Sequence, residues 1–373
     1  MIKVLYLLST LQRTGPTQQL FYIISNLDRE EYDPVVVTLS PEPEDSLLAT
    51  YESDGIKVLQ LGLGRVRGLF KAKLKVEEII SSFQPAIIHS QGVRGDLLSC
   101  SLNSSAKKIT TVRNYPSIDY RMMYGQFLGF IIYKLQVFSF SKIDLCCAVS
   151  EAVLSNLRES HKLENVCTVR NGVSQSRYNP GDEQSKSDVR ENLSIPCGSK
   201  VFLSHIGKDS RKNSALVAKA FYDKFGYSKD VYLIFLGKGM QEKECRWLTK
   251  DVDNVLYLGS VNNVEDYLRA SDFFVSASRA EGMPNAVLEA MACGLPVILS
   301  NIEPHAEVHY LSNGSAYMFD VDSPRSLEGA MLKAMKADYN LDRERSLKCI
   351  DGELSDRVMS SKYQEIYAKI IAV

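Results

Sequence analysis

The sequence has no long apolar run of the kind that crosses a membrane. Its longest apolar stretch, residues 127–133, is followed at once by Lys134 and Gln136. That stretch is far shorter than the roughly 20 residues that a membrane-spanning helix needs. The apolar run at residues 1–8 is too short for the core of a signal peptide and indicates a first buried strand. We therefore expect a cytoplasmic protein without a membrane-spanning segment.

The chain also lacks an excess of charge and any paired cysteine motif. It has 44 Lys and Arg against 45 Asp and Glu, a formal net charge of −1. Proteins that bind nucleic acid usually carry a basic excess, so we expect no nucleic-acid partner. The eight cysteines form no Cys-x-x-Cys pair, and Cys146 and Cys147 are adjacent in an apolar run. Reduced, mostly buried thiols are expected, and a metal or redox site is the alternative.

Short apolar runs alternate with amphipathic patterns along the 373 residues, of which 45% are apolar and 24% are charged. This length suits two globular domains better than one core. In the helical candidate 17–27, four apolar residues share one face. The alternation predicts an α/β protein, with parallel strands joined by crossover helices in two doubly wound sheets. The strands expected are 2–8, 35–39, 57–61, 86–89, 109–112 and 144–149 in the first half, and 201–206, 231–237, 255–259, 272–278, 297–300 and 317–319 in the second.

A polar stretch without periodicity, residues 174–200, separates the two series of strands and predicts the linker. Ligands of open α/β sheets bind beyond the carboxyl ends of the strands. We therefore expect the binding site at this edge of the sheets, in the gap between the two halves.

The segment after strand 272–278 is the strongest candidate for a site. Glu281 lies in a loop, and Pro284 is expected as the first residue of a helix that Gly294 ends. Glu289 would then lie more than one turn inside that helix. The backbone amides near 282–285 and the helix dipole would hold a diphosphate. Taken alone, the two glutamates could equally be a solvated loop residue and an ordinary helix residue.

The sequence Glu-Gly-Met-Pro-Asn-Ala-Val-Leu-Glu at 281–289, with its continuation to Ile298, closely resembles the donor-site signature of retaining family 4 glycosyltransferases. That family has the GT-B fold of two Rossmann-like domains facing a central cleft. The resemblance implies an acceptor-binding domain, 1–178, and a nucleotide-sugar-binding domain, 179–355. It also implies that a last helix, 356–373, packs back on the first domain. The donor-binding residues that it implies here are Glu281, Gly282, Met283, Pro284, Asn285 and Glu289.

In the family, such enzymes transfer a hexose or N-acetylhexosamine with retention of configuration, and they need no metal or other cofactor. For this chain the resemblance implies a nucleotide-sugar donor, with UDP as the expected nucleotide. It implies a saccharide or lipid-linked saccharide as acceptor and a role in bacterial surface polysaccharide biosynthesis. Catalysis would consist of positioning the substrates and stabilising the charge of the leaving group.

A second segment, 206–213, is similar to the family's diphosphate-binding loop. The family has Gly-Arg and then Lys-Asn, and here Lys208 and Lys212 occupy the two cationic positions. The resemblance makes Lys212 catalytic together with Glu281. Lys208 keeps the charge of the usual arginine but lacks its bidentate fork. The alternative is two surface lysines at the start of a helix.

The first half departs from the family at two positions. Gly15 stands alone where the family usually has a Gly-Gly pair near the donor. The alternative is that Gly15 is only a turn residue before a helix. The segment 86–92 resembles the family's His-x-His-Gly strand end, but Gln91 replaces the second histidine, and an amide cannot act as a base. Either His89 takes part in catalysis or no side-chain base is needed. Gln91 and Arg113 are the acceptor-side candidates.

Two further segments each leave two interpretations open. Residues 65–75 combine five cations with apolar residues, which suits a peripheral contact with an anionic membrane surface or a solvated helix face. Residues 120–140, rich in Met, Phe and Tyr, fit a buried core helix or, as the second choice, an apolar acceptor groove. If the first segment meets lipid, the protein is peripheral on the inner membrane face.

Two rival functions remain beside the glycosyltransferase. A nucleotide-sugar epimerase can share this fold, but it would need acid and base groups that the sequence does not reveal. A nucleotide-sugar-binding partner subunit without catalysis would explain the changes around Gly15 and Gln91. The presence of Glu281, Glu289 and Lys212 argues against that subunit, because a protein without turnover has less need of them.

Overall fold

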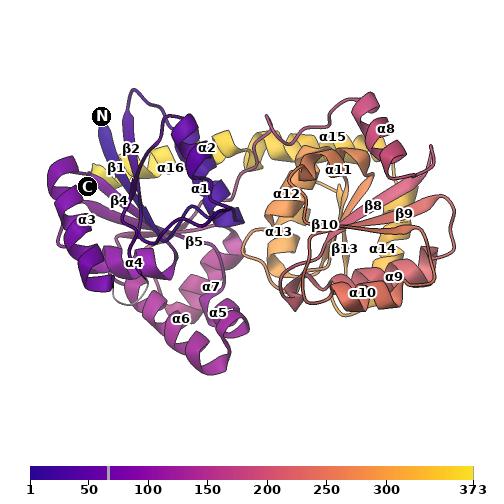
Figure 1. The fold of residues 1–373 in the computed structure, drawn as a ribbon, viewed down its shortest axis with the longest axis horizontal. Coiled ribbons are helices and arrows are strands. Elements are labelled where there is room, and N and C mark those ends of the chain that lie inside the picture. Colours follow the sequence, from indigo (N-terminus) through magenta and orange to yellow (C-terminus); the bar gives the residue numbers. More distant parts are fainter. Residues whose placement is uncertain (65–67, 373) are drawn as a thin grey trace. The chain divides into compact units, whose positions relative to one another are not determined.

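The computed structural model describes residues 1–64 and 68–372. The chain forms two compact units (Figure 1). Unit 1 consists of Met1–Gly172 together with Asp356–Val373, and unit 2 is Val173–Ser355. Each unit is an α/β structure around its own parallel sheet, so the predicted doubly wound fold is confirmed.

Unit 1 contains a seven-stranded sheet in the order β3-β2-β1-β4-β5-β6-β7, in which every neighbouring pair is parallel. The central strand β4 is buried along its whole length, and β1 and β5 are buried after their first two residues, because helices cover both faces, as a parallel sheet requires. The three-residue strand β7 was not predicted. The strands are β1 (Ile2–Leu8), β2 (Tyr32–Thr38), β3 (Lys57–Gln60), β4 (Ile87–Gln91), β5 (Lys107–Val112), β6 (Leu145–Ala148) and β7 (Val166–Thr168).

Two separate apolar clusters cover the two faces of this sheet. Helices α1, α2 and α16 contribute to one cluster, and α3 and α4 contribute to the other (Figure 1). The predicted helix 17–27 is α1, which begins two residues earlier at Gly15 and ends at Ser25. The helices of unit 1 are α1 (Gly15–Ser25), α2 (Leu48–Ser53), α3 (Leu69–Phe83), α4 (Gly92–Ser101), α5 (Pro116–Tyr124), α6 (Gln126–Phe140), α7 (Glu151–His161) and α16 (Asp356–Ile371).

Helix α16 supplies core residues of unit 1, although 183 residues of unit 2 precede it in the chain. Tyr363 and Tyr367 are 1% and 0% exposed and lie in the same cluster as β1 and α1. The Ser360 hydroxyl donates a hydrogen bond to the Ile23 carbonyl at 2.8 Å. Unit 1 is therefore built from both ends of the described chain.

Unit 2 contains a six-stranded parallel sheet in the order β10-β9-β8-β11-β12-β13. Helices α9 and α14 bury their apolar faces against one side of it. The strands are β8 (Lys200–His205), β9 (Val231–Leu236), β10 (Val255–Gly259), β11 (Phe273–Ser276), β12 (Val297–Ser300) and β13 (Ala316–Phe319). The helices are α8 (Glu183–Asn192), the short η1 (Ser210–Lys212), α9 (Ser214–Phe225), α10 (Glu242–Leu248), α11 (Val264–Ala270), α12 (Asn285–Ala292), α13 (Glu303–Leu311), α14 (Pro324–Lys336), α15 (Tyr339–Cys349) and the π-helical turn η2 (Ile350–Leu354).

The polar stretch 174–200, which the sequence predicts as the linker, contains helix α8. The Asp182 side chain caps this helix by accepting a hydrogen bond from the Ser185 amide at 2.7 Å. Arg190 and Lys186 form ion pairs with Asp272 at 2.9 and 3.0 Å. None of the residues of α8 is buried. Hydrogen bonds and ion pairs therefore hold this helix in place. Contacts of this kind produce no periodic pattern of apolar residues in the sequence.

The expectation of a buried core helix over 120–140 is also wrong. The segment forms two helices, α5 and α6, which meet at Gly125 with φ at +79°. Positive φ suits glycine and ends α5 at this point. Most of the large apolar side chains of the segment are exposed, including Phe127 at 81% and Phe138 at 57%.

Among the described residues, every helix is too short or too polar to pass through a bilayer. The basic segment 65–75 is described only in part, because residues 65–67 lie outside the described range. Its second part opens helix α3, where Leu74 is 62% exposed. All eight cysteines are free thiols, and five of them are buried.

Candidate active site

The loops that follow β8 and β11 bring two of the predicted residues together. These strands are neighbours in the sheet of unit 2, so their carboxyl ends lie side by side. Lys212 comes from η1 after β8, and Glu281 comes from the loop after β11. The Lys212 ammonium donates to Glu281 Oε1 at 2.7 Å, and the two side chains are 28% and 13% exposed. The pair is partly buried but open to a ligand.

Local interactions hold Lys212 in this position. The Asp209 carboxylate caps η1 by accepting from the Arg211 amide at 3.0 Å. A Cβ atom on Gly207 would come within 2.5 Å of the Lys212 side chain, so the lysine stem lies directly over that glycine. The Arg279 amide donates to the Arg211 carbonyl at 2.8 Å and joins the loop of Glu281 to η1. The two loops therefore form one connected structure.

Glu281 is held in its ionised form. Burial alone would raise its pKa, but the charge of Lys212 and the hydrogen bonds from Lys212 and Ser278 outweigh that effect and lower the pKa. The Ser278 hydroxyl donates to Glu281 Oε1 at 2.7 Å. Two donors to one oxygen leave the second oxygen of the carboxylate available as an acceptor.

Two histidines near this pair remain neutral. Burial lowers the pKa of His205 to about 3 and that of His305 to about 4. His305 is bonded by its Nδ1 to the Ser300 hydroxyl at 2.9 Å and by its Nε2 to the Ser276 hydroxyl at 3.2 Å. Lys212 is therefore the cation that lowers the pKa of Glu281 most strongly. Sequence reasoning missed both histidines and Ser278, because a single polar residue at a strand end carries no periodic signal.

Glu289 lies in the second turn of α12, as predicted, and has an unusual environment. Burial raises its pKa from 4.5 to about 7, against the opposing charges of Arg177 and Lys212 and a hydrogen bond from Tyr178. Arg177 and Tyr178 come from the segment before α8, and Tyr178 is 5% exposed. Neither residue was a sequence candidate. The raised pKa makes Glu289 a group whose charge changes near neutral pH.

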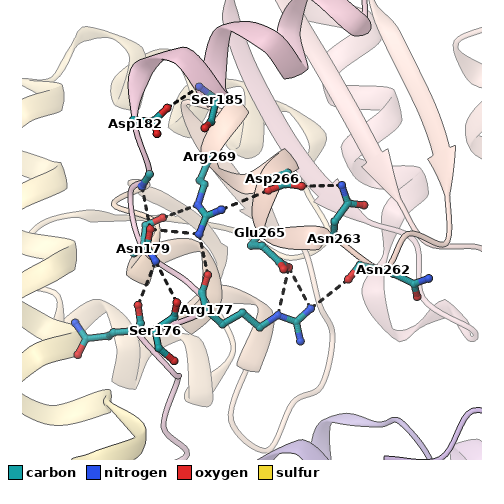
Figure 2. A network of polar contacts seen from close by, with 12 residues as sticks. Ser176, Arg177, Asn179, Asp182, Ser185, Asn262, Asn263, Glu265, Asp266 and Arg269 are labelled. Atoms are coloured by element: carbon teal, nitrogen blue, oxygen red, sulfur yellow. Dashed lines mark hydrogen bonds and ion pairs between the residues drawn. The ribbon is translucent and has the colours of Figure 1, made fainter. Parts of the chain in front are cut away.

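A polar network fixes this segment on α11 and the loop before it (Figure 2). The Arg177 guanidinium pairs with Glu265 at 3.1 Å and donates to the Asn262 carbonyl at 3.2 Å. In the opposite direction, Arg269 of α11 donates to the carbonyls of Arg177 and Asn179 at 2.9 and 3.0 Å. This reciprocal arrangement holds Arg177 and the adjacent Tyr178 in place near Glu289.

The remaining donor candidates occupy the loop between Glu281 and α12. Gly282, Met283 and Pro284 are buried, and Asn285 is half-buried. Helix α12 begins at Asn285, so the expectation that Pro284 is its first residue is wrong by one position, and Pro284 is the capping residue. Its φ of −81° with ψ of 84° lies outside the helical region, which accounts for the shift. Lys208 is exposed on the loop between β8 and η1.

Unit 1 contains a pocket of about 370 Å³ at the carboxyl ends of β1, β4 and β5. It brings together the acceptor-side candidates Gln91 and Arg113, whose side chains are joined by a hydrogen bond of 3.4 Å. The pocket is lined by Leu8, Ser9, Thr10, Gln12, Thr14, Pro16, Thr17, Gln91, Gly92, Thr111, Arg113, Asn114, Tyr120, Met123 and Gln136.

Both candidates have donors that the protein leaves unused. In the described part of the chain, Gln91 Nε2 and Arg113 Nε are buried without a hydrogen-bond partner, and Gln91 is 8% exposed. A buried donor without a partner costs about 1–3 kcal/mol. Arg113 Nη1 donates to Asn171 at 3.0 Å, which fixes the guanidinium beside the pocket. The arrangement suits a ligand with oxygen acceptors.

His89 lies in a buried network and does not line this pocket. Its ring is 0% exposed, with Nδ1 bonded to Tyr367 at 2.6 Å and Nε2 bonded to Thr111 at 2.8 Å. Burial and, to a lesser extent, the charge of Arg113 lower its pKa to about 3. Because both nitrogens are used and the ring is inaccessible, this geometry gives His89 a structural role and does not support its prediction as a catalytic base.

Gly15 is the first residue of α1 and is exposed. Thr14, which precedes it, caps the helix, and the Thr14 amide donates to the Thr17 hydroxyl at 3.1 Å. Thr14, Pro16 and Thr17 line the unit 1 pocket. The turn at Gly15 therefore contributes to the wall of that pocket.

Comparisons with known proteins match both units to the same class. Residues 14–177 match the family model described as Glycosyltransferase Family 4, and residues 200–337 match the model described as Glycosyl transferases group 1. The O-antigen biosynthesis glycosyltransferase WclY from Escherichia coli is 24% identical over 376 residues, which is 98% of each chain.

Two other relatives show the range of this similarity. The UDP-Gal:alpha-D-GlcNAc-diphosphoundecaprenol alpha-1,3-galactosyltransferase of Escherichia coli is 31% identical over 144 residues, 37% of each chain. The crystal structure of Anabaena HepE in complex with UDP-glucose covers 99% of this chain and 100% of its own, with a TM-score of 0.82 and 15% identity.

The family matches and the two doubly wound units define the class of the protein, which is a glycosyltransferase with the GT-B fold. Within that class, the chain belongs with the group 1, family 4 type glycosyltransferases, and it is an enzyme of the hexosyltransferase type.

Proposed function

We propose that the protein transfers a hexose or N-acetylhexosamine from a UDP-sugar to a lipid-linked or free saccharide, with retention of configuration and without a metal. The observation that carries this proposal is the Lys212–Glu281 pair at 2.7 Å, beside the start of α12. It combines a cation suited to a diphosphate with a carboxylate suited to sugar hydroxyls.

The donor side of the reaction would use three residues of unit 2. Lys212, with Lys208 nearby in sequence, would stabilise the negative charge that develops on the departing diphosphate. Glu281 would accept hydrogen bonds from hydroxyls of the transferred sugar through its second oxygen. Glu289 would accept from the ribose hydroxyls. Because Lys212 and the dipole of α12 supply positive charge, no metal is proposed.

The acceptor side would use the pocket of unit 1. The unused donors of Gln91 and Arg113 would bind oxygen atoms of the saccharide or of a phosphate attached to it. Since neither residue is a base at neutral pH, the proton of the acceptor hydroxyl would pass to the leaving phosphate oxygen on the same face of the sugar. The bond from the sugar carbon to that phosphate oxygen breaks as the new glycosidic bond forms.

The names of the relatives support the choice of substrates. One relative takes UDP-Gal and a diphosphoundecaprenol acceptor, the one similar over the full length serves O-antigen biosynthesis, and HepE was crystallised with UDP-glucose. We infer a role in bacterial surface polysaccharide biosynthesis for this chain.

The test is nucleoside diphosphate release from a panel of UDP-, GDP- and ADP-sugars, with and without diphosphoundecaprenol-linked saccharides, in the presence of EDTA. Release from a UDP-sugar that depends on the acceptor is the expected result. Lys212→Ala and Glu281→Ala should each lower the rate at least about tenfold, a cost of about 1.4 kcal/mol. The matched control is Lys219→Ala, since this lysine of α9 pairs with Asp223 on the surface.

Three outcomes would contradict the proposal. A new sugar isomer formed from the donor alone would show an epimerase. Binding of nucleotide sugars without turnover over the whole acceptor panel would show a partner subunit. Full activity in both Lys212→Ala and Glu281→Ala would remove these residues from the site.

A further inference from the structure

Helices α5 and α6 of unit 1 carry their large apolar side chains on the outside. Of the eighteen exposed large hydrophobic residues in the part of the chain that the structure describes, ten lie on these two helices. We call this surface the α5–α6 face. Its residues are Ile118, Met122, Met123, Tyr124, Phe127, Leu128, Phe130, Ile131, Leu135 and Phe138. A concentration of exposed apolar side chains of this kind is typical of an interaction site.

Helix α6 differs from an ordinary surface helix because most of its large apolar side chains are exposed. An ordinary helix buries its apolar stripe and exposes its polar one. Here six of the large apolar side chains are exposed, and the residues that α6 buries are Gly129, Gln136 and Ser139 together with Tyr133 and Phe140. The Gln136 amide donates to Asp96 at 2.8 Å and accepts from the Tyr120 hydroxyl at 2.5 Å. The polar side of α6 is therefore firmly bonded to unit 1, and its apolar side is presented outward.

The charges around the α5–α6 face have one sign. The sole acidic residue in 116–142 is Asp119, which is 2% exposed and accepts from the Tyr115 amide at 3.0 Å. The cations of the same segment are Arg121, Lys134 and Lys142. Arg121 and Lys134 lie over the ring of Phe130 at 5.4 and 5.6 Å. Within residues 116–142, the surface is thus apolar and positive, and its one carboxylate is buried.

We propose that the α5–α6 face docks the protein on an anionic lipid bilayer, with its apolar side chains in the interfacial region. Aromatic and aliphatic side chains bordered by Lys and Arg are typical of surfaces that lie in a membrane interface. The cations then meet anionic headgroups, which attract them. A second copy on the same face would add cations to cations with no carboxylate to pair with. Charge therefore favours the bilayer over self-association.

The same two helices also line the pocket of unit 1, and Met123 belongs both to the pocket and to the α5–α6 face. Tyr120 and Met123 of α5 and Gln136 of α6 contribute to that pocket. A docked α5–α6 face would hold the pocket close to the membrane surface, where the diphosphate and sugar of a lipid-linked acceptor are presented. This last step rests on the proposed function, whereas docking itself does not.

The test is sedimentation of the full chain with vesicles of phosphatidylcholine, with or without phosphatidylglycerol. We expect binding that is stronger to the mixed vesicles and weaker at high salt. The double variant Phe127→Ser/Phe138→Ser should lower the partition coefficient at least about tenfold, or about 1.4 kcal/mol. The control is Tyr227→Ser/Tyr310→Ser in unit 2, because these aromatic residues are 78% and 85% exposed. That control should bind as the parent chain does.

Thermal unfolding and UDP binding serve as the check that each variant is folded. Equal sedimentation of the parent and the Phe127/Phe138 variant would overturn the proposal, as would the absence of binding by the parent. Binding lost in Lys71→Ser/Lys75→Ser but kept in the Phe127/Phe138 variant would assign docking to α3 instead. A dimer seen by sedimentation equilibrium and abolished by the Phe127/Phe138 substitutions would show that a second copy occupies the face. None of these outcomes tests transfer itself, so the proposed function stands or fails separately.

Discussion

Three ionisable residues that the sequence predicted for the site differ in how the protein controls their charge. Glu281 is kept ionised by Lys212 and Ser278, and His89 is kept neutral by complete burial. Glu289 differs from both because burial raises its pKa to about 7. Its charge is therefore the one that responds to pH in the neutral range.

Substitution of Glu289 should reveal this titration in UDP binding. In the proposed function, ribose hydroxyls donate to the ionised carboxylate, so UDP should bind more tightly as the pH rises through about 7. In Glu289→Gln this contribution is absent. The ratio of the parent's affinity to that of Glu289→Gln, measured by calorimetry, should rise through pH 7. The titration of UDP itself affects both proteins equally and cancels in this ratio. A ratio that is independent of pH would contradict the assignment of Glu289 to UDP binding.

The ligand-free protein should show the opposite trend in stability. Because the folded-state pKa lies above the ordinary value of 4.5, the ionised form is disfavoured by folding. Stability from this group is complete below pH 4.5 and is lost as the pH rises through about 7. The free energy of unfolding of Glu289→Gln should therefore rise relative to that of the parent over this range.

The sequence identified the residues at motif positions but not the residues that hold them in place. Glu281, Glu289 and Lys212 were identified because they stand at fixed spacings in segments that resemble a known family. Ser278 and Tyr178 were missed, since contacts between distant loops leave no spacing to detect. His89 was a catalytic candidate because Gln91 replaces the family's second histidine and cannot act as a base. The burial of His89 depends on α16, where its partner Tyr367 lies 278 residues further along the chain.

At the scale of elements, glycine determines how closely α5 and α6 pack. A Cβ atom on Gly129 would come within 2.3 Å of the Tyr120 carbonyl oxygen. The backbone of α6 therefore contacts α5 directly at this point. By contrast, Gly329 in α14 is exposed and has nothing within 4 Å of an added Cβ atom.

Alanine at these two helical glycines should have opposite effects. Gly129→Ala should destabilise unit 1 by about 1–3 kcal/mol, because the helices must separate to admit the methyl group. Gly329→Ala should stabilise the protein by up to about 1 kcal/mol, because alanine favours the helical backbone. Urea unfolding measures both, and a stabilising effect at Gly129 would contradict the described packing.

The elements that periodicity predicts correctly are those with buried faces. Strands β1, β10 and β12 have the predicted bounds, because each is an apolar run between turns. Helix α8 was missed because polar contacts hold it. The segment of α5 and α6 was wrongly predicted as a buried helix, because its apolar residues were assumed to be buried. In the structure, α6 buries Gln136 and Ser139 and exposes most of its large apolar side chains. A pattern of apolar residues identifies the apolar face of a helix, but it does not show whether the rest of the protein covers that face.

At the scale of the whole molecule, unit 1 is discontinuous in sequence and unit 2 is continuous. The chain leaves unit 1 after Gly172 and returns at Asp356. The Val173 amide donates to the Leu354 carbonyl at 2.9 Å, so the outgoing and returning segments are adjacent. Apart from Gly15, the candidate donor residues belong to unit 2, and the pocket with Gln91 belongs to unit 1.

This division predicts how the separated units behave. Residues 173–355 alone should fold and bind UDP, because they contain Lys212, Glu281 and Glu289. Residues 1–172 joined by a short Gly-Ser linker to 356–373 should fold without binding UDP. Residues 1–172 alone should be less stable by at least about 3 kcal/mol, because the aromatic side chains of α16 are lost from the core. Calorimetry and urea unfolding measure these outcomes, and UDP binding by the joined unit 1 would contradict them.

The discontinuity of unit 1 also bears on how the protein is made. Domains fold as units while the chain is synthesised. Residues 1–172 leave the ribosome first, yet their core stays incomplete until α16 follows, so unit 2 can finish folding earlier. In the interval, the side chains that Tyr363 and Tyr367 later cover are open to chaperones and proteases. Translation that stops before α16 should therefore yield a chain that is degraded, although unit 2 is already formed.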